Sequence, residues 1–191
     1  DKTGQDVEDE GPRESEVIMA EAEKFKPTSP VTTSGEKKKL GEKKLVEDAT
    51  EEAKRDGRPV EEVVKEKLDL TTARKYVLDF ETSPGAPFFR PEYYGSQVRL
   101  VINRSHRFYS DIYDAPAAPT RLKAALELFL FVLGSSELGA VGDREKFYER
   151  ERGEWSQQIN TVLGLLEDRD PVDESAEADA ITSEETSEVA G

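Results

Sequence analysis

Residues 75–103, with the sequence KYVLDFETSPGAPFFRPEYYGSQVRLVIN, decide the fold of this 191-residue chain. The two ends of this stretch, 75–82 and 97–103, alternate apolar and polar side chains, which is the pattern of a strand with one buried face. The side chains predicted to face the core are Tyr76, Leu78, Phe80, Val98, Leu100 and Ile102.

A third strand is predicted between these two, at 87–94. Pro91 lies inside it and has no N–H for a ladder hydrogen bond, so we expect an edge or irregular strand there. Pro84-Gly85 and Gly95-Ser96 mark the turns on either side. Because these connections are short, the stretch predicts a three-stranded antiparallel meander.

Helices are predicted on the C-terminal side of the strands. Ser105 is the expected N-cap of a short helix that packs on the sheet. Residues 120–133, TRLKAALELFLFVL, are apolar on most sides and predict a central buried helix. Asp143 begins the last helix, which should pack on 120–133 as an antiparallel hairpin. The apolar residues expected to anchor the short and the last helix are Phe108, Tyr109, Ile112, Tyr113, Tyr148, Trp155, Ile159, Val162, Leu163 and Leu166.

Three further helices are predicted before the strands, with weaker anchoring. Residues 14–25 have a helix-forming composition, and Pro27 and Pro30 then interrupt the pattern. Residues 36–58 are strongly charged with few apolar positions, so we expect an exposed helix. Pro59 suits the first turn of the third helix. The expected anchors are Val17, Ile18 and Phe25 in the first helix and Val60, Val63, Val64 and Leu68 in the third.

The net charge of −15 is concentrated at the two ends of the chain. Residues 1–16 hold seven acidic and two basic side chains, and residues 167–191 hold ten and one, which leaves −1 for residues 17–166. Acid-rich segments without aromatic residues bury too little apolar area to offset their ordering entropy. We therefore expect disordered tails, which either solvate the protein or bind a basic partner; the first alternative is the commoner one.

The sequence thus predicts an α+β fold, a three-stranded antiparallel meander packed with a C-terminal helix hairpin, with exposed N-terminal helices and disordered acidic tails. We divide the chain into four parts: a mostly disordered acidic segment at 1–35, a charged exposed helix at 36–58, a compact α+β module at 59–168 and a disordered acidic tail at 169–191.

No apolar run is long enough to span a bilayer, and the absence of cysteine is typical of a cytoplasmic protein.

His106 is the only histidine, and the chain has no cysteine. One histidine without cysteines cannot build a usual zinc site. A Ser–His–Asp arrangement would need Ser105 or Ser110 with Asp111, but these are close neighbours in the sequence and no oxyanion hole or nucleophile elbow accompanies them. We therefore expect His106 to bond a local carbonyl group or to pack on an aromatic ring.

Glu127 lies inside the apolar helix, where a charged group is costly unless it is paired. We expect it to bind an arginine or lysine across the helix hairpin or to face solvent. The lysines within 37–44 form either a basic patch for nucleic acid or a solvated helix face, and the glutamates among them favour the solvated face.

Two more features are relevant to ligand binding. Gly139 to Gly142 precede a helix, but the chain has neither phosphate-cradling glycine motif, GxxxxGK[ST] or GxGxxG. Four aromatic residues lie close together in the sequence: Phe88, Phe89, Tyr93 and Tyr94. They form either a stacking platform for a base or part of the core, and the core is the commoner arrangement. The sequence therefore identifies no catalytic, cofactor-binding or metal-binding residue.

Five short segments match the pattern of a known family: Phe88-Phe89-Arg90, Gln97 to Asn103, His106 to Tyr109, the ALELFLFVL helix, and Glu149 to Trp155-Ser156. Together they resemble the C-terminal region of bacterial ATP-binding proteins of the GHKL class, which includes gyrase B, histidine kinases, heat-shock chaperone ATPases and MutL. The resemblance covers about residues 60–166 and rests on packing residues. The family binds ATP through an upstream Mg²⁺ helix, an Asp-x-Gly-x-Gly turn and a glycine-rich lid, and none of these occurs here.

The resemblance implies that this chain is a non-catalytic module for packing, transduction or dimer contact in a longer protein. Its ATPase domain, which would bind ATP and Mg²⁺, would precede Asp1 and would be the main partner, and a homodimer is a second expected partner. The alternative is a free-standing interaction or scaffold module without an ATPase parent. In neither case do we expect this chain alone to be an enzyme, to enter a membrane or to bind nucleic acid.

Overall fold

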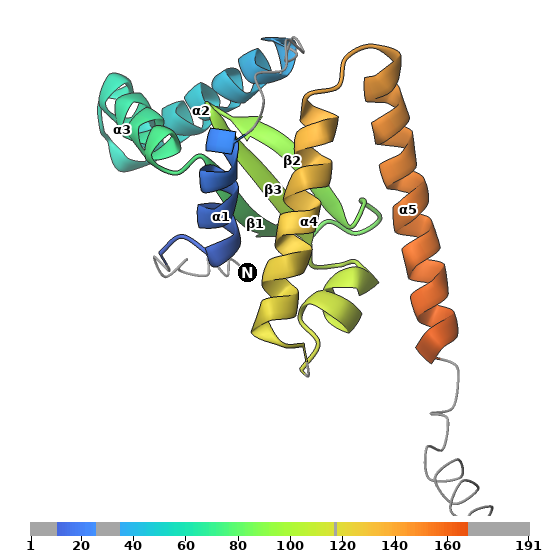
Figure 1. The fold of residues 1–191 in the computed structure, drawn as a ribbon. Coiled ribbons are helices and arrows are strands. Elements are labelled where there is room, and N and C mark those ends of the chain that lie inside the picture. Colours follow the sequence, from blue (N-terminus) through green and yellow to red (C-terminus); the bar gives the residue numbers. More distant parts are fainter. Residues whose placement is uncertain (1–10, 26–34, 117, 168–191) are drawn as a thin grey trace, which may run out of the picture.

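The computed structural model describes residues 11–25, 35–116 and 118–167. Most of the predicted disorder of the acidic ends lies outside these ranges. The described part is α+β, with helices around one three-stranded sheet (Figure 1). Its strands are β1 (Tyr76–Glu81), β2 (Phe89–Tyr94) and β3 (Gln97–Asn103).

The predicted strands are confirmed, but the predicted antiparallel meander is wrong. The strand order is β1-β3-β2, with β3 in the centre, antiparallel to β2 and parallel to β1. Leu100 at the middle of β3 pairs with Leu78 on one side and with Pro91 on the other. The chain from Thr82 to Ser96, which includes β2, is the crossover that a parallel pair requires.

Pro91 explains why β2 is at the edge, as predicted. The Asn103 N–H donates to the Phe88 carbonyl at 3.0 Å, so residues 88 and 103 form a hydrogen-bonded pair. Because such pairs alternate along an antiparallel ladder, Pro91 and Leu100 form a non-bonded pair, and the position without an N–H points away from β3. A meander would have placed this proline in the central strand, where a ladder bond would be missing.

The helix α1 (Glu14–Ala22), followed by the single turn η1 (Glu23–Phe25), covers the free edge of β1. The Leu78 N–H on this edge donates to Glu16 Oε1 at 2.9 Å. Met19 enters the core, whereas Val17 and Ile18 are exposed, and the side chain of Phe25 lies outside the described residues. The expectation of an exposed helix is therefore wrong for α1. Polar groups, rather than the expected apolar anchors Val17 and Ile18, attach this helix to the sheet.

The charged helix α2 (Gly35–Asp56) is also not exposed all round. Its buried residues recur every four positions, at Gly41, Leu45, Ala49 and Ala53, so they form one narrow ridge. Gly41 lies directly on Tyr93 of β2, and Ala49 and Ala53 pack on Val63 of α3 (Val60–Ala73). Sequence reasoning missed this ridge because small residues contribute little hydrophobicity. In α3, Val60 and Val64 are half-buried as predicted, whereas Leu68 is exposed.

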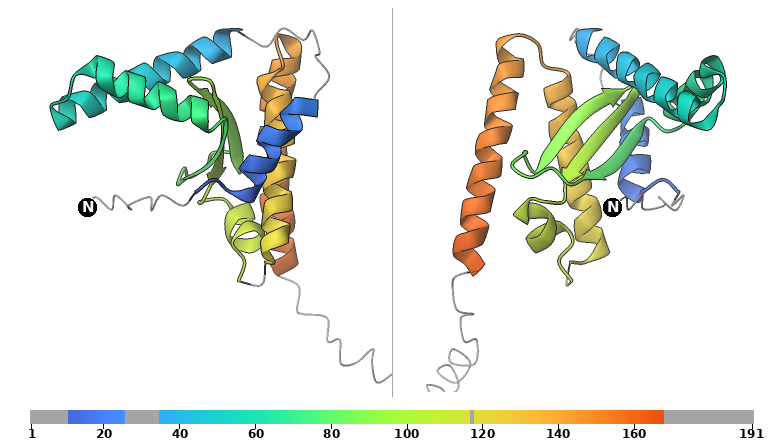
Figure 2. Two further views of the ribbon diagram at one scale, coloured as in Figure 1. Left: turned by 60° about the vertical axis from the view of Figure 1, so that its left-hand side comes forward. Right: turned by 180° about the vertical axis from the view of Figure 1, so that it is seen from behind.

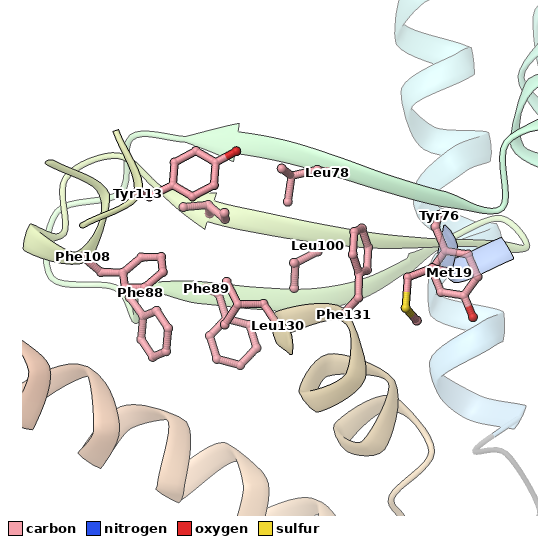
Figure 3. Close-up of a cluster of buried hydrophobic side chains, with 11 residues drawn as sticks. Met19, Tyr76, Leu78, Phe88, Phe89, Leu100, Phe108, Tyr113, Leu130 and Phe131 are labelled. Atoms are coloured by element: carbon pink, nitrogen blue, oxygen red, sulfur yellow. The ribbon is translucent and has the colours of Figure 1, made fainter. Parts of the chain in front are cut away.

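The core lies between the sheet and α4 (Thr120–Leu138), with α1 alongside (Figures 1 and 3). Leu130 and Phe131 extend from α4 toward the sheet, and the Phe131 ring meets Tyr76 edge-on at 5.6 Å. The short helix predicted after Ser105 is a π-helix, η2 (Phe108–Tyr113), with Arg107 rather than Ser105 at its N-cap. Phe108 and Tyr113 are buried, as expected.

The last helix, α5 (Asp143–Glu167), runs antiparallel to α4 but stands beside it rather than packing along its whole length (Figure 2). Trp155 and Ile159 are half-buried against the core, whereas Val162 and Leu166 are exposed. The predicted hairpin is therefore correct in direction, but its seam is shorter than expected. Ser156, the one buried residue of α5, bonds Phe88, just before β2, and His106, in the segment after β3, instead of α4.

Candidate interaction surface and the polar sites around it

His106 is buried where four segments meet: the residues after β3, the helix η2, the helix α5 and the residues just before β2. Its Nδ1 accepts a hydrogen bond from the Phe108 N–H at 3.0 Å, so its Nε2 carries the proton and donates to the Ser156 carbonyl, also at 3.0 Å. Burial lowers the pKa of His106, and the Phe88 ring packs 5.7 Å from the imidazole. The histidine does bond a carbonyl and pack on an aromatic ring, although the carbonyl is 50 residues away in the sequence rather than local.

The Ser–His–Asp alternative finds no support in this geometry. Both nitrogens of His106 are occupied by backbone groups. Ser110 Oγ instead donates to Asp111, and the backbone N–H of Ser105 donates to Asn103 Oδ1 at 3.0 Å. Neither Ser105 nor Ser110 is therefore hydrogen-bonded to His106. Within the described ranges, no group of three or more histidine and acidic side chains could hold a metal ion.

A hollow of about 160 Å³ lies beside this junction. Its walls contain hydrogen-bonding groups but, apart from His106, no ionisable side chain. Such a lining suits water or a small neutral polar group and offers nothing to neutralise a phosphate. The polar residues in its wall are Asn103, Ser105, His106, Ser156, Gln157 and Asn160.

Glu127 is buried rather than exposed, and its partners do not come from across the helix hairpin. It accepts hydrogen bonds from Tyr113 Oη at 2.5 Å, from Ser15 Oγ, and from Arg13 Nη1 at 3.4 Å. Burial and the hydrogen bond to Glu127 raise the pKa of Tyr113. Two of the three partners belong to the N-terminal segment, so Glu127 is part of a polar cluster that attaches α1 to α4.

Glu16 makes the second part of this attachment. Besides the Leu78 N–H, its carboxylate accepts two hydrogen bonds from the Arg74 guanidinium, at 2.9 and 2.7 Å. A buried carboxylate is stable only when its oxygens are paired in this way. The oxygens of Glu16 and Glu127 thus accept hydrogen bonds from structural partners. We therefore interpret these two carboxylates as groups that attach α1 and not as catalytic groups.

Three of the lysines within 37–44 form ion pairs: Lys37, Lys43 and Lys44. Lys37 Nζ donates to the carbonyls of Glu137 and Ala140 at the end of α4, at 3.0 and 3.3 Å, and pairs with Glu145. Lys44 pairs with Glu92 of β2 at 2.8 Å. The end of α4 and the turn that follows it thus present the carbonyl groups of Glu137 and Ala140 to a cation, which is the reverse of a phosphate-binding loop.

The aromatic group of β2 belongs mainly to the core. Phe88 and Phe89 are fully buried and lie in contact, with ring centroids 4.8 Å apart. Tyr94 is buried under the Arg99 guanidinium at 4.0 Å, and Tyr93 is half-buried beneath α2. None of these rings is free to stack on a base.

The surface that sequence reasoning missed is on α4. Four outward side chains form what we call the α4 stripe: Leu122, Ala125, Phe129 and Val132. The exposed fractions of the three large ones are 46% for Leu122, 61% for Phe129 and 56% for Val132. The sheet covers only one side of α4, and no described element covers the opposite side (left view of Figure 2). The sequence carried a signal for this surface, because a helix that is apolar all round needs cover on more than one side.

No family model, no curated protein and no solved structure matches this chain. Within the described ranges, no helix is both long enough and apolar enough to cross a membrane.

Proposed function

We propose that this chain is a non-catalytic protein-interaction module and that the α4 stripe is its contact surface. The observation that carries the proposal is an exposed row of apolar side chains on the most apolar helix of the chain. Exposed apolar residues gathered in one place are characteristic of sites that bind another protein. The titratable side chains buried nearby already have structural partners.

The stripe offers a recognisable anchor. Phe129 is the largest and most exposed side chain in it, and aromatic residues at the centre of a contact contribute a large share of binding energy. Fully burying a side chain such as leucine or phenylalanine contributes about 1.5–3 kcal/mol. Covering the exposed part of the three large side chains would therefore contribute on the order of 3–4 kcal/mol.

The test is photo-crosslinking in a cell that expresses the full chain. Phe129 is replaced by benzoylphenylalanine, and the matched control carries the same group at Leu40, an exposed apolar residue of α2. We expect one discrete adduct from position 129 and none from position 40. An absence of adducts at 129, or equal adducts at both positions, would contradict the proposal.

A second proposal follows from the sequence resemblance, namely that this module belongs to a longer, cytoplasmic GHKL-type ATP-binding protein. What supports it is that residues from separate matching segments meet at one junction. The Phe88 N–H donates to Ser156 Oγ at 3.1 Å, His106 bonds the Ser156 carbonyl, and the Phe88 and Phe108 rings lie 5.0 Å apart. Such a junction is what conserved packing residues of a shared fold would build.

The coding sequence upstream of Asp1 tests this second proposal directly. We expect it to contain an Asn-bearing Mg²⁺ helix and an Asp-x-Gly-x-Gly turn. Their absence would refute the ATPase parent and leave the free-standing interaction module. In either case, titration of this chain with Mg-ATP is expected to show no saturable heat, because at the turn from Gly139 to Gly142 the Ala140 carbonyl, and not an N–H group, faces the Lys37 ammonium.

A further inference from the structure

We infer that the α4 stripe binds a second copy of this chain, with the two α4 helices antiparallel across a two-fold axis at Phe129. The inference rests on the proposed function and specifies the partner. Its basis is the spacing, the size and the lack of charge of the outward side chains of α4.

The spacing places these side chains in one straight row. Positions 122, 125, 129, 132 and 136 are separated by steps of three and four, which keeps them on one side of a helix. The opposite side of α4 is the one that packs on the sheet, through Leu130, Phe131 and Gly134. Between residues 123 and 138, the exposed residues are Ala125, Phe129 and Val132, and Ser136 is half-buried.

The row is complementary to itself when one copy is reversed. With the axis at Phe129, the two copies of Phe129 meet each other. Leu122 then lies opposite Ser136 of the second copy, and Ala125 lies within one residue, about 1.5 Å along the helix, of the position opposite Val132. Each large side chain away from the axis therefore meets a small one, which is how helix surfaces interdigitate. An isologous contact of this kind closes after two copies.

Charge also favours a second copy over a charged partner. From Ala124 to Ser136, α4 has one ionisable side chain, Glu127, and it points inward to Tyr113 and Ser15. Arg121 and Lys123 flank Leu122 at the start of the stripe, and Lys123 pairs with Asp114. Beyond Leu122 the stripe offers no group that would select a partner by charge. A second copy brings an equally uncharged surface, and the net charge of −15 lies mainly in residues 1–16 and 167–191, which leaves −1 for residues 17–166.

The size of the stripe sets the expected strength. From Leu122 to Val132 it extends about 15 Å, at 1.5 Å per residue. With on the order of 100 Å² for each of its three large side chains, it buries about 300 Å² per copy, which is less than half of the roughly 800 Å² of a standard interface. We therefore expect a reversible dimer that forms with rising protein concentration.

Sedimentation of the purified full chain tests the inference, from low micromolar to about 1 mM protein. The mass should rise from 21.4 kDa toward twice that value. Phe129→Glu should keep the chain monomeric, while Leu40→Glu, an apolar-to-acid change on the exposed side of α2, should behave like the wild type. Far-ultraviolet circular dichroism establishes that each variant is folded, and Val132→Glu provides a second disruptive change.

Disulfide trapping tests the orientation, because the chain has no cysteine of its own. Phe129→Cys should cross-link to itself. Ala125→Cys should cross-link to Val132→Cys in a mixture but not to itself, since two copies of residue 125 are about 12 Å apart along the helices. Parallel packing would instead cross-link each variant to itself and would overturn the antiparallel arrangement.

A monomer at every concentration, or a dimer that Phe129→Glu leaves intact, would overturn the inference. These results are distinguishable from a failure of the proposed function. A monomeric chain whose position 129 still gives a discrete adduct to a different protein would remain an interaction module. A chain that is monomeric and gives no adduct at 129 would refute both.

Discussion

Gly41→Ala is expected to destabilise the protein, although alanine is the better helix former. Gly41 lies inside α2, where this helix crosses β2. A Cβ atom at this position would lie 2.6 Å from both the Cβ and the carbonyl oxygen of Tyr93, and 2.7 Å from its carbonyl carbon. Two of these three atoms are backbone, so the strand cannot yield and α2 must move outward.

The magnitude follows from three contributions. Moving α2 strains the hydrogen bond from the Gly95 N–H to the Gly41 carbonyl, now 3.0 Å, which contributes about 1 kcal/mol. Overpacking against the strand, including the loosened contacts of the fully buried Leu45, costs about 1–3 kcal/mol. The higher helix propensity of alanine returns about 1 kcal/mol. The net expectation is a loss of about 1–3 kcal/mol in the free energy of unfolding.

Urea unfolding of the full chain, followed by circular dichroism, measures this loss. Gly153→Ala is the matched control, because Gly153 lies inside α5 and a Cβ there would meet nothing within 4 Å. The control should gain up to about 1 kcal/mol. If Gly41→Ala were stabilised as much as Gly153→Ala, α2 would not pack on β2, and the helix would be exposed as its sequence suggests.

Three further predictions concern buried side chains. Glu127→Ala should lower the free energy of unfolding by about 3–5 kcal/mol in chemical denaturation, since Arg13, Ser15 and Tyr113 lose their shared acceptor; a loss below about 1 kcal/mol would place α1 elsewhere. Because the folded pKa of His106 is below its ordinary value of 6.5, stability is present above about pH 6.5 and is lost as the pH falls through the folded pKa. His106→Gln should therefore lose less stability than the wild type between about pH 8 and 5, and equal losses would contradict this. Trp155 is half-buried, so its emission should red-shift on unfolding and Trp155→Ala should cost about 2 kcal/mol, less than the 3–5 kcal/mol of a fully buried tryptophan; an unshifted spectrum would detach α5 from the core.

The strand order was within reach of the sequence. Pro91 predicts an edge strand, and the two-residue hairpin turn at Gly95-Ser96 joins that strand to 97–103. Together these two facts place 97–103 in the centre and the 75–82 strand beyond it, parallel. The short connections favour a meander, whereas the missing N–H of Pro91 favours the observed order.

The exposed α4 stripe was less accessible to sequence reasoning. The residues 120–133 are apolar on most sides, and this pattern alone does not say which side the sheet covers. The small residues Gly41, Ala49 and Ala53 show the same difficulty, since their value lies in letting another element approach closely. A residue without a large side chain carries no hydrophobic signal of its own.

The sequence by itself determined the three strands, the helices and the absence of recognisable catalytic motifs, because periodicity, turn residues and caps act over a few neighbouring positions. Only the tertiary structure decided that α1 covers the edge of β1, that Glu127 binds Ser15 and that Phe129 stays exposed. These outcomes depend on contacts between residues more than 60 positions apart. Such contacts are selected by the packing of the whole chain, which no local pattern encodes.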